Sequence, residues 1–309
     1  MFFHRKRYTN LDDVPTGKTF GEMLQWRKER KAKIKDLSYT IPQCREVDLA
    51  FLKRNRTAPL LVWIGHASFL LQIHGLNILI DPVWANRMGF EKRLSPPGLP
   101  LDELPQIDIV LVSHGHYDHL DFPTLRRLQG NPQFFVPIGL GRLFRKKGFR
   151  RISEFSWWEQ AEHGGVSFHF VPAQHWTRRS LFDTNTSHWG GWVIQFGQEP
   201  ALYFSGDSGY FRGFQEIGER FSIGIALMPI GAYEPEWFMS NQHMTPEESI
   251  QAFLDLRASL FIPMHYGAFR LADDTPKEAL DRLQREWKRR ELPSKQLRIL
   301  QLGEMYWPT

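Results

Sequence analysis

Three histidines and one aspartate lie within six consecutive positions, directly after a short apolar run. The run covers residues 109–112, and after one serine it is followed by His-Gly-His-Tyr-Asp-His at positions 114–119. Continuous apolar runs of this length are typical of strands that are covered on both faces. In a loop that leaves a strand end, residues two positions apart can point the same way. The first two histidines can therefore bind one metal ion, while the aspartate and the third histidine bind another.

The chain from position 60 onward predicts strands that alternate with helices. Strands are predicted at 60–64, 68–73, 77–80, 109–112, 133–137, 167–171, 191–196, 201–204, 225–228 and 260–263. Helices are predicted at 123–128, 246–256 and 276–290, where Asp121, Thr245 and Thr275 provide N-caps. Buried strands with helices between them indicate layered sheets that carry the helices on their outer faces.

Three further apolar runs lead to a residue of a type that binds metals. The strand predicted at 167–171 leads to His175, the strand at 201–204 leads to Asp207, and the strand at 260–263 leads to His265. Two metal ions with about four or five ligands each need this inventory, and one carboxylate can bridge them. Asp207 is the candidate bridge.

Composition excludes several other classes of protein. The single cysteine, Cys44, rules out an intrachain disulfide and a cysteine-rich zinc cluster. Residues 57–80 carry no charged side chain, and a membrane-spanning helix needs about 20 apolar residues. This segment also contains two histidines, two glycines and a proline, so two or three buried strands explain it better than one helix.

Positive charge is concentrated near the start of the chain. Residues 5–35 contain ten Lys or Arg and four Asp or Glu, a net charge of +6, whereas the whole chain has +5. A helix with an apolar edge and a basic face is predicted there from Phe20, Leu24, Arg27, Lys31, Ile34 and Leu37. Packing of this helix on the main domain and contact with an anionic membrane or a nucleic acid are both compatible with the pattern.

The segment 114–119 carries the unmodified His-x-His-x-Asp-His hallmark of the metallo-β-lactamase superfamily, which this chain resembles. The resemblance implies an α/β fold of the α+β type, a four-layer αββα sandwich with metals at one edge of its two sheets. Together with the charge pattern, the chain is predicted to consist of a basic N-terminal helical arm over 1–58 that packs on a metallo-β-lactamase-like hydrolase domain over 59–309. The resemblance also implies one metal ion at His114, His116 and His175, a second at Asp118, His119 and His265, and Asp207 between them.

Further short motifs resemble the N-acylphosphatidylethanolamine-hydrolysing phospholipase D family, over about residues 60–269. These motifs are Trp63-Ile64-Gly65-His66-Ala67-Ser68, Ile80-Asp81-Pro82, His119-Leu120-Asp121, Gln174-His175-Trp176, Gly206-Asp207-Ser208-Gly209-Tyr210, Gly231-Ala232-Tyr233-Glu234-Pro235 and His265-Tyr266-Gly267. This resemblance implies a zinc-dependent phosphodiesterase that acts on N-acylphosphatidylethanolamine or a similar amphiphile. The implied step is attack of a metal-bound hydroxide on phosphorus.

Residues beside the ligands are candidates for supporting roles. Asp81 is predicted to accept the free N–H of a liganding imidazole, with turn capping as the alternative. By resemblance, His243 faces the site and holds a phosphoryl oxygen or donates a proton, with helix capping or surface exposure as the alternative. His66 is either an outer partner of the site or a buried histidine with its hydrogen bonds satisfied. The predicted catalytic residues are Asp118, His243 and Asp81.

Substrate contacts are predicted just after His175. Arg178 and Arg179 could clamp an anionic group in bidentate fashion, and surface solvation explains them equally well. Trp176 could line an apolar groove for an acyl chain, with core packing as the alternative for most tryptophans.

Imidazole and carboxylate ligands favour two zinc ions, although iron or manganese would also accept them. Because His116 stands where the diiron oxygen-reducing branch of the superfamily has a carboxylate, hydrolysis is favoured over redox chemistry. The alternative enzyme is a lactonase or another ester hydrolase on the same metal pair. A nuclease that binds nucleic acid through the arm and a non-catalytic metal-binding module are disfavoured.

The expected partner is therefore a small-molecule or lipid phosphodiester, and no nucleic acid. We expect the protein in the cytoplasm. Peripheral contact with a membrane and a homodimer stay open.

Overall fold

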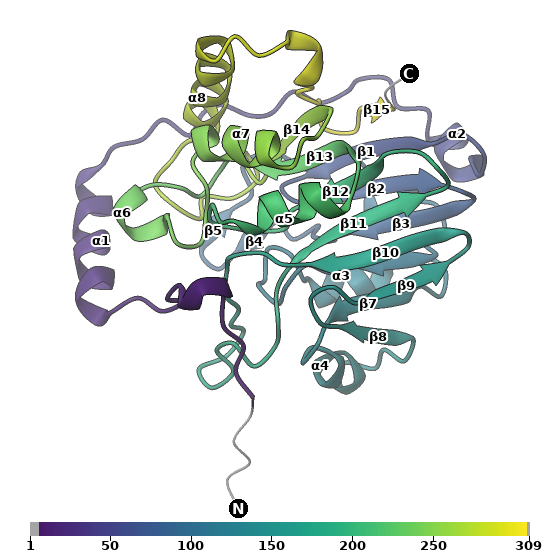
Figure 1. Ribbon diagram of the computed structural model, residues 1–309, viewed down its shortest axis with the longest axis horizontal. Coiled ribbons are helices and arrows are strands. Elements are labelled where there is room, and N and C mark those ends of the chain that lie inside the picture. The colour runs from purple at the N-terminus through teal and green to yellow at the C-terminus, as the bar shows by residue number, and fades with distance from the viewer. Residues whose placement is uncertain (1–5, 308–309) are drawn as a thin grey trace, which may run out of the picture.

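Two β-sheets pack face to face, with helices on the outer side of each, in the computed structural model, which describes residues 6–307 (Figure 1). One sheet has seven strands in the order β15-β1-β2-β3-β6-β7-β8, and the other has six in the order β14-β13-β12-β11-β10-β9. The strands of the first sheet are β1 (Leu60–Gly65), β2 (Ser68–Ile73), β3 (Leu76–Ile80), β6 (Ile109–Leu111), β7 (Gln133–Pro137), β8 (Ile152–Phe155) and β15 (Met305–Tyr306). Those of the second are β9 (Gln160–His163), β10 (Val166–Val171), β11 (Gly191–Phe196), β12 (Ala201–Phe204), β13 (Ile223–Pro229) and β14 (Leu260–Met264).

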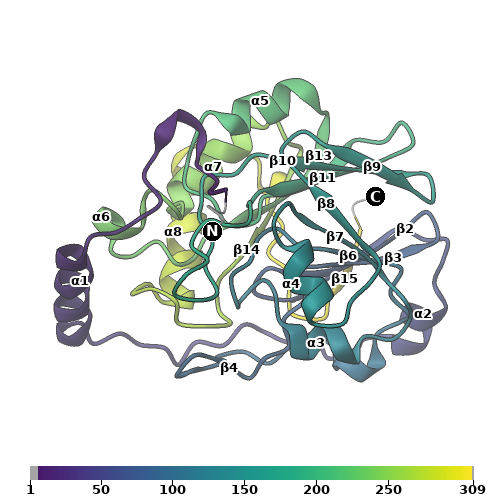
Figure 2. The same ribbon diagram turned by 90° about the horizontal axis from the view of Figure 1, so that it is seen from below.

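The helices lie outside the two sheets, and a small hairpin stands apart (Figure 2). The helices are α1 (Phe20–Ala32), α2 (Leu49–Arg54), α3 (Phe122–Arg127), α4 (Gly141–Lys146), α5 (Gly213–Arg220), α6 (Glu236–Met239), α7 (Pro246–Asp255) and α8 (Pro276–Arg289). The hairpin is β4 (Arg87–Met88) with β5 (Glu91–Lys92), and short 3-10 helices occupy Leu11–Asp13, Leu101–Glu103 and Ser294–Gln296.

The apolar strands are buried on both faces, as their composition predicts. In β1, Leu61 and Trp63 belong to the core between the sheets, whereas Val62 and Ile64 pack in a second core that includes side chains of α2, α3 and α4. Successive side chains of a strand point to opposite faces, so one run of apolar residues supplies both cores. The predicted αββα sandwich is confirmed.

All ten predicted strands are present, and the strand predictions at 68–73, 133–137, 191–196 and 201–204 have the observed bounds. Residues 57–80 contain β1, β2 and β3, and within residues 6–307 no helix is long and apolar enough to cross a membrane. Strands β8 and β9 were not predicted, because their exposed edge positions carry polar residues that interrupt an apolar run.

The three predicted helices are α3, α7 and α8. Asp121 caps α3 by accepting a hydrogen bond from the backbone N–H of Thr124. Helices α7 and α8 both begin with a capping box, in which the N-cap threonine and a glutamate three residues later exchange hydrogen bonds. The helix ends differ from the predictions by one residue at most.

The predicted apolar edge of the arm helix is wrong. Helix α1 ends at Ala32, and Ile34 beyond it is fully exposed. Phe20 is 78% exposed, whereas Trp26 stacks on Phe238 of α6 at a centroid distance of 4.9 Å. The helix packs through this other face because α6, rather than the sheets, is its partner. The division of the chain at residue 58 stays a prediction.

The segment before α1 is tied to the second sheet by one buried side chain, Asn10. Its Oδ1 accepts hydrogen bonds from the backbone N–H of His175, at 2.9 Å, and from Nε1 of Trp189, at 3.0 Å. Asn10 thereby contacts His175, a predicted metal ligand that lies 165 positions later in the chain.

We predict that Asn10→Ala lowers the free energy of unfolding by about 1–3 kcal/mol, because it leaves the buried N–H of His175 without an acceptor. Urea denaturation would measure the loss. Thr9→Ala, at an exposed neighbouring position, should change stability by less than about 0.5 kcal/mol. Equal stability of the two variants would show that this contact does not anchor the segment.

Candidate metal centre

The residues predicted as ligands lie in loops at one edge of the sandwich. Strands β3 and β6 are parallel, and Asp81 and the segment 114–119 follow their carboxyl ends. In the second sheet β12, β13 and β14 are parallel, and Asp207 and His265 follow β12 and β14. The carboxyl ends of parallel strands share one edge, so loops distant in sequence meet there.

The first cluster consists of His114, His116, His175 and Asp207. Nδ1 of His116 lies 2.9 Å from Nε2 of His114 and 3.2 Å from Nε2 of His175. Oδ2 of Asp207 lies 3.9 Å from Nε2 of His114 and 3.7 Å from that of His175. Three imidazole nitrogens and one carboxylate oxygen therefore face a common point.

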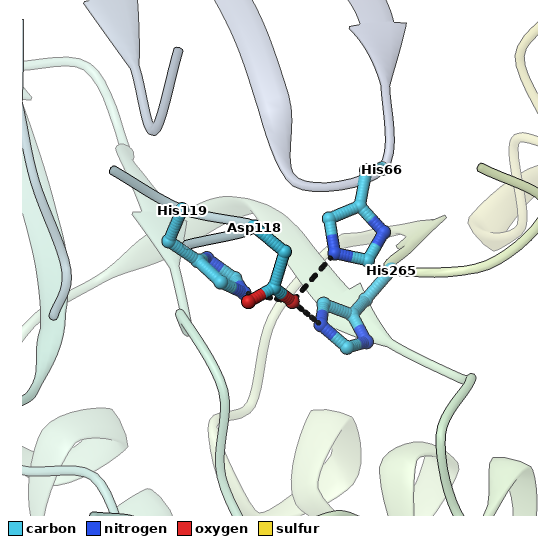
Figure 3. A group of neighbouring side chains, drawn as sticks. All are labelled: His66, Asp118, His119 and His265. Atoms are coloured by element: carbon cyan, nitrogen blue, oxygen red, sulfur yellow. Dashed lines mark hydrogen bonds and ion pairs between the residues drawn. The ribbon is translucent and has the colours of Figure 1, made fainter. Parts of the chain in front are cut away.

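The second cluster consists of His66, Asp118, His119 and His265 (Figure 3). Oδ2 of Asp118 lies 3.0 Å from Nε2 of His66, 3.4 Å from Nε2 of His119 and 3.5 Å from Nε2 of His265. The carboxylate thus lies between three imidazole rings that come from three different loops.

Asp207 touches both clusters. Its Oδ2 lies 3.2 Å from Nε2 of His119, and its Oδ1 lies 3.0 Å from Nε2 of His265. The same Oδ2 faces His114 and His175 of the first cluster. The structure therefore brings all seven predicted ligands together, and Asp207 contacts members of both clusters.

Several buried nitrogen and oxygen atoms of the centre have no hydrogen-bond partner, and bound metal ions would satisfy them. Nε2 of His116, Nε2 of His119, Nε2 of His265 and Oδ1 of Asp207 are buried and have no hydrogen-bond partner. Buried polar atoms are normally paired, because an unpaired one has lost its hydration without compensation. Imidazole and carboxylate atoms that converge in this way provide the ligands that zinc, iron and manganese accept.

Electrostatics holds the carboxylates ionised. Burial by itself would raise the pKa of Asp207, but the positive charges of His119 and His265 outweigh it and hold that pKa well below its usual range. Burial would likewise lower the pKa of His265, yet Asp207 and Asp118 raise it to about 9. The centre therefore presents anionic oxygen atoms, as a cation site requires.

Asp81 contacts His119 at the ring nitrogen that points away from the two clusters. It is fully buried, and its Oδ2 lies 2.7 Å from Nδ1 of His119. Its Oδ1 accepts a hydrogen bond from the backbone N–H of Ser113 at 2.7 Å. These contacts fix the orientation of the His119 ring, so that Nε2 faces the clusters.

His243, which precedes α7, faces the centre. A ring nitrogen of His243 lies within 4.8 Å of ligand atoms of Asp207 and His265, and Nδ1 is buried without a partner. Burial lowers the pKa of His243 to about 4, so the neutral ring can donate one hydrogen bond at neutral pH. His243 is partly exposed, and it does not cap α7, whose N-cap is Thr245.

The residues predicted to contact substrate divide into two groups. NH1 of Arg179 donates to the backbone carbonyls of Gly115 at 2.8 Å and Leu120 at 2.9 Å, so this guanidinium braces the metal-binding loop. Arg178 is exposed, and its guanidinium lies 5.6 Å from the ring of Trp176. Trp176 packs edge-on against His116, at a centroid distance of 4.8 Å. Substrate contact stays a prediction for all three residues.

Two contacts that hold His175 in place were not predicted from the sequence. The backbone carbonyl of Gln242 lies 2.9 Å from Nδ1 of His175 and can accept its proton, which fixes the tautomer of the ring. Asn10 holds the backbone of the same residue. A backbone carbonyl carries no sequence signal, and a single asparagine in an arm carries very little.

His66 contacts both sides of the second cluster. Its ring lies 3.0 Å from Asp118, and its backbone carbonyl accepts a hydrogen bond from the backbone N–H of His265 at 3.1 Å. The residue is 1% exposed and adopts a left-handed backbone, with φ of 55°. His66 therefore positions a carboxylate and an imidazole that approach the same point.

We predict that His66→Ala weakens metal binding by about 10–100-fold, because Asp118 loses the hydrogen bond that orients it. His66→Gln, which keeps a side-chain N–H, should restore part of the affinity. Chelator competition monitored by metal analysis would measure both. His74→Ala, at an exposed turn position, is the control. Unchanged metal affinity in His66→Ala would refute the positioning role.

Comparison with known proteins supports a common origin for this fold and centre. A family model described as a beta-lactamase superfamily domain matches residues 76–266. The chain is 37% identical over 226 residues to N-acyl-phosphatidylethanolamine-hydrolyzing phospholipase D 1 of Caenorhabditis elegans, and this match covers 67% of the chain and 63% of that enzyme. The chain therefore spans less than two thirds of the length of this relative. The resemblance read from the short motifs is confirmed.

Two shorter proteins match over most of their length. A metal-dependent hydrolase of Methanopyrus kandleri is 30% identical over 222 residues, which cover 71% of this chain and 88% of that one. The solved structure of a metallo hydrolase from the archaeon Ignicoccus hospitalis superposes with a TM-score of 0.61 and 25% identity, over 81% of this chain and 98% of that one. These matches show that the chain belongs to the metallo-β-lactamase superfamily, among relatives that are named as metal-dependent hydrolases.

Proposed function

We propose that the protein is a zinc-dependent phosphodiesterase of phospholipase D type that hydrolyses N-acylphosphatidylethanolamine or a similar amphiphile. The observation that carries this proposal is the contact of Asp207 with both ligand clusters. A carboxylate shared by two clusters is the arrangement of two-metal hydrolases, which stabilise both the attacking and the leaving oxygen of a phosphoryl group. The named activity of the nematode relative supports a phosphodiester in preference to a lactone.

In this proposal His114, His116 and His175 would hold one cation, Asp118, His119 and His265 the other, and Asp207 would lie between them. When bound, two such cations would supply a water whose pKa falls far below that of bulk water, to about 7, and positive charge that stabilises the transition state. Zinc is proposed because imidazole and carboxylate donors suit it.

His243 is the residue proposed to assist the leaving group. Its ring packs nearly parallel to that of His265 at a centroid distance of 5.6 Å, on the side of the centre formed by the loop before α7. The negative charge of a bound phosphodiester would favour the protonated ring, and this imidazolium could donate its proton to the alkoxide as the bond to phosphorus breaks, which leaves a neutral imidazole. The alternative role is a hydrogen bond to a non-bridging phosphoryl oxygen.

We predict that removal of metal with a chelator abolishes release of phosphatidic acid from N-acylphosphatidylethanolamine, and that zinc restores it in proportion to occupancy. The zinc-loaded protein would be assayed with that lipid, soluble phosphodiesters and lactones. Asp207→Asn should lower activity and metal content together, whereas Asp281→Asn on the exposed face of α8 should leave both unchanged. Hydrolysis of lactones without hydrolysis of any phosphodiester would replace the proposal with the ester hydrolase.

We predict that His243→Gln lowers kcat on the lipid by about 10²–10⁴-fold while the zinc content stays at the wild-type level, because proton transfer is lost. A p-nitrophenyl phosphodiester distinguishes the two roles of the residue, since its leaving group departs as a stable anion. A much smaller loss on that substrate indicates proton donation. Equal losses on both substrates indicate a hydrogen bond to phosphoryl oxygen, and no loss on either excludes His243 from the reaction.

A further inference from the structure

The loop between His175 and His188 ends in an apolar tip. Leu181 and Phe182 are 82% and 83% exposed, and they are adjacent in the chain. The other large apolar side chains exposed to a similar degree within residues 6–307 stand singly, at Phe20, Ile34 and Phe90. Two neighbouring side chains of this size are costly to leave in water unless something covers them.

Basic side chains line a groove beside this loop. A groove of about 440 Å³ lies between the loop and α4, and Arg142, Lys146, Lys147 and Arg178 line it. The only acidic residue that lines the groove is Asp183, whose Oδ1 accepts hydrogen bonds from two backbone N–H groups of the loop itself. Among the described residues, the groove beside the apolar tip therefore presents cations and no free carboxylate.

This concentration of charge differs from the sequence expectation, which placed the positive charge in the arm alone. Residues 142–151 contain six Lys or Arg and no acidic residue. The fold also brings the start of the described chain to this face, since NH1 of Arg7 donates to the carbonyl of Thr184 at 2.9 Å. Figure 1 shows α4 and the purple N-terminal segment at the same lower end of the molecule, and Figure 2 looks onto that end.

The base of the loop is fixed while its tip is free. The backbone N–H of Asn185 donates to the carbonyl of Thr177 at 2.8 Å, and the side chain of Asn185 accepts from the backbone N–H of Thr177 at 3.1 Å. The backbone N–H of Tyr8 adds a further hydrogen bond to Asn185 at 2.9 Å. Because the base of the loop is already ordered, the loop loses little conformational entropy when its tip binds another surface.

The same loop is bonded to the metal centre. The hydroxyl of Tyr117 donates to the carbonyl of Arg179 at 2.8 Å, and Arg179 in turn holds the carbonyls of Gly115 and Leu120. Thr177 accepts a hydrogen bond from the backbone N–H of Gly115 at 3.2 Å. A surface that the tip enters would therefore lie beside the segment that carries His114 and His116.

We propose that this face docks on an anionic lipid bilayer, with Leu181 and Phe182 inserted among the lipids and the neighbouring Lys and Arg side chains against the headgroups. Exposed apolar side chains with cations beside them are complementary to an anionic bilayer, which has acyl chains beneath negatively charged headgroups. A nucleic acid would satisfy the cations but would leave the exposed leucine without an apolar partner. The inference rests on the proposed function for its purpose, because docking would bring a lipid phosphodiester to the metal centre.

The test is sedimentation of the full chain with vesicles of phosphatidylcholine alone or with about 30% phosphatidylserine. The wild-type protein should bind the anionic vesicles, and binding should fall as salt is raised. The double variant Leu181→Ser/Phe182→Ser should bind at least about tenfold more weakly, since two apolar anchors are lost. The control is Phe90→Ser, which removes a fully exposed phenylalanine from the turn of the β4–β5 hairpin and should bind as the wild type does.

A lack of vesicle binding by the wild type, or equal binding by the double variant, would overturn the proposal. Preferential binding to duplex RNA or DNA that the double variant retains would also overturn it, as would a dimer in solution that the double variant abolishes. Hydrolysis of a soluble phosphodiester by the double variant should equal that of the wild type. If no phosphodiester is cleaved while the tip still governs vesicle binding, the docking surface stands and the proposed function fails.

Discussion

The packing of ionised carboxylates among buried imidazole rings is the constraint on which the centre depends. Asp118 and Asp207 lie against ring nitrogens of five buried histidines, and some of these nitrogens have no hydrogen-bond partner. Burying such groups is unfavourable unless their charges and lone pairs are matched. Cations between the two clusters would match them all at once, so metal binding and the stability of this edge are coupled.

The sandwich makes that arrangement available because its strands end together. Each ligand loop follows a strand whose side chains are packed on both faces, so the loops start from fixed positions. Contacts behind the ligands complete the alignment: Asp81 fixes the ring of His119, and the carbonyl of Gln242 fixes that of His175. The rigid part of the fold thus determines where ligand atoms converge, and the loops determine which residues provide them.

Much of the fold and of the ligand set could be predicted because the signals are local. Continuous apolar runs mark the buried strands, and each ligand follows such a run within a few residues. The face of α1 could not be predicted, because its partner is α6, more than 200 residues later, and Trp26 looks no more apolar in sequence than Leu24. The same holds for Asn10, whose importance lies in two buried N–H groups that only the tertiary structure brings to it.

The net charge of each sequence segment predicts the sign of the charge, but not the face of the folded molecule on which uncompensated charge lies. Residues 5–35 contain ten Lys or Arg and four acidic residues. Helix α1 packs against α6, however, and Arg30 and Lys35 form ion pairs with Asp273 and Glu278. The basic residues that line a groove beside the metal-binding loop come instead from α4 and from the loop after His175. Charges compensated within the fold contribute little to attraction at a distance, whereas uncompensated ones on a single face add up. The electrostatic character of each face of the molecule is therefore set by which acidic side chains lie beside its basic ones.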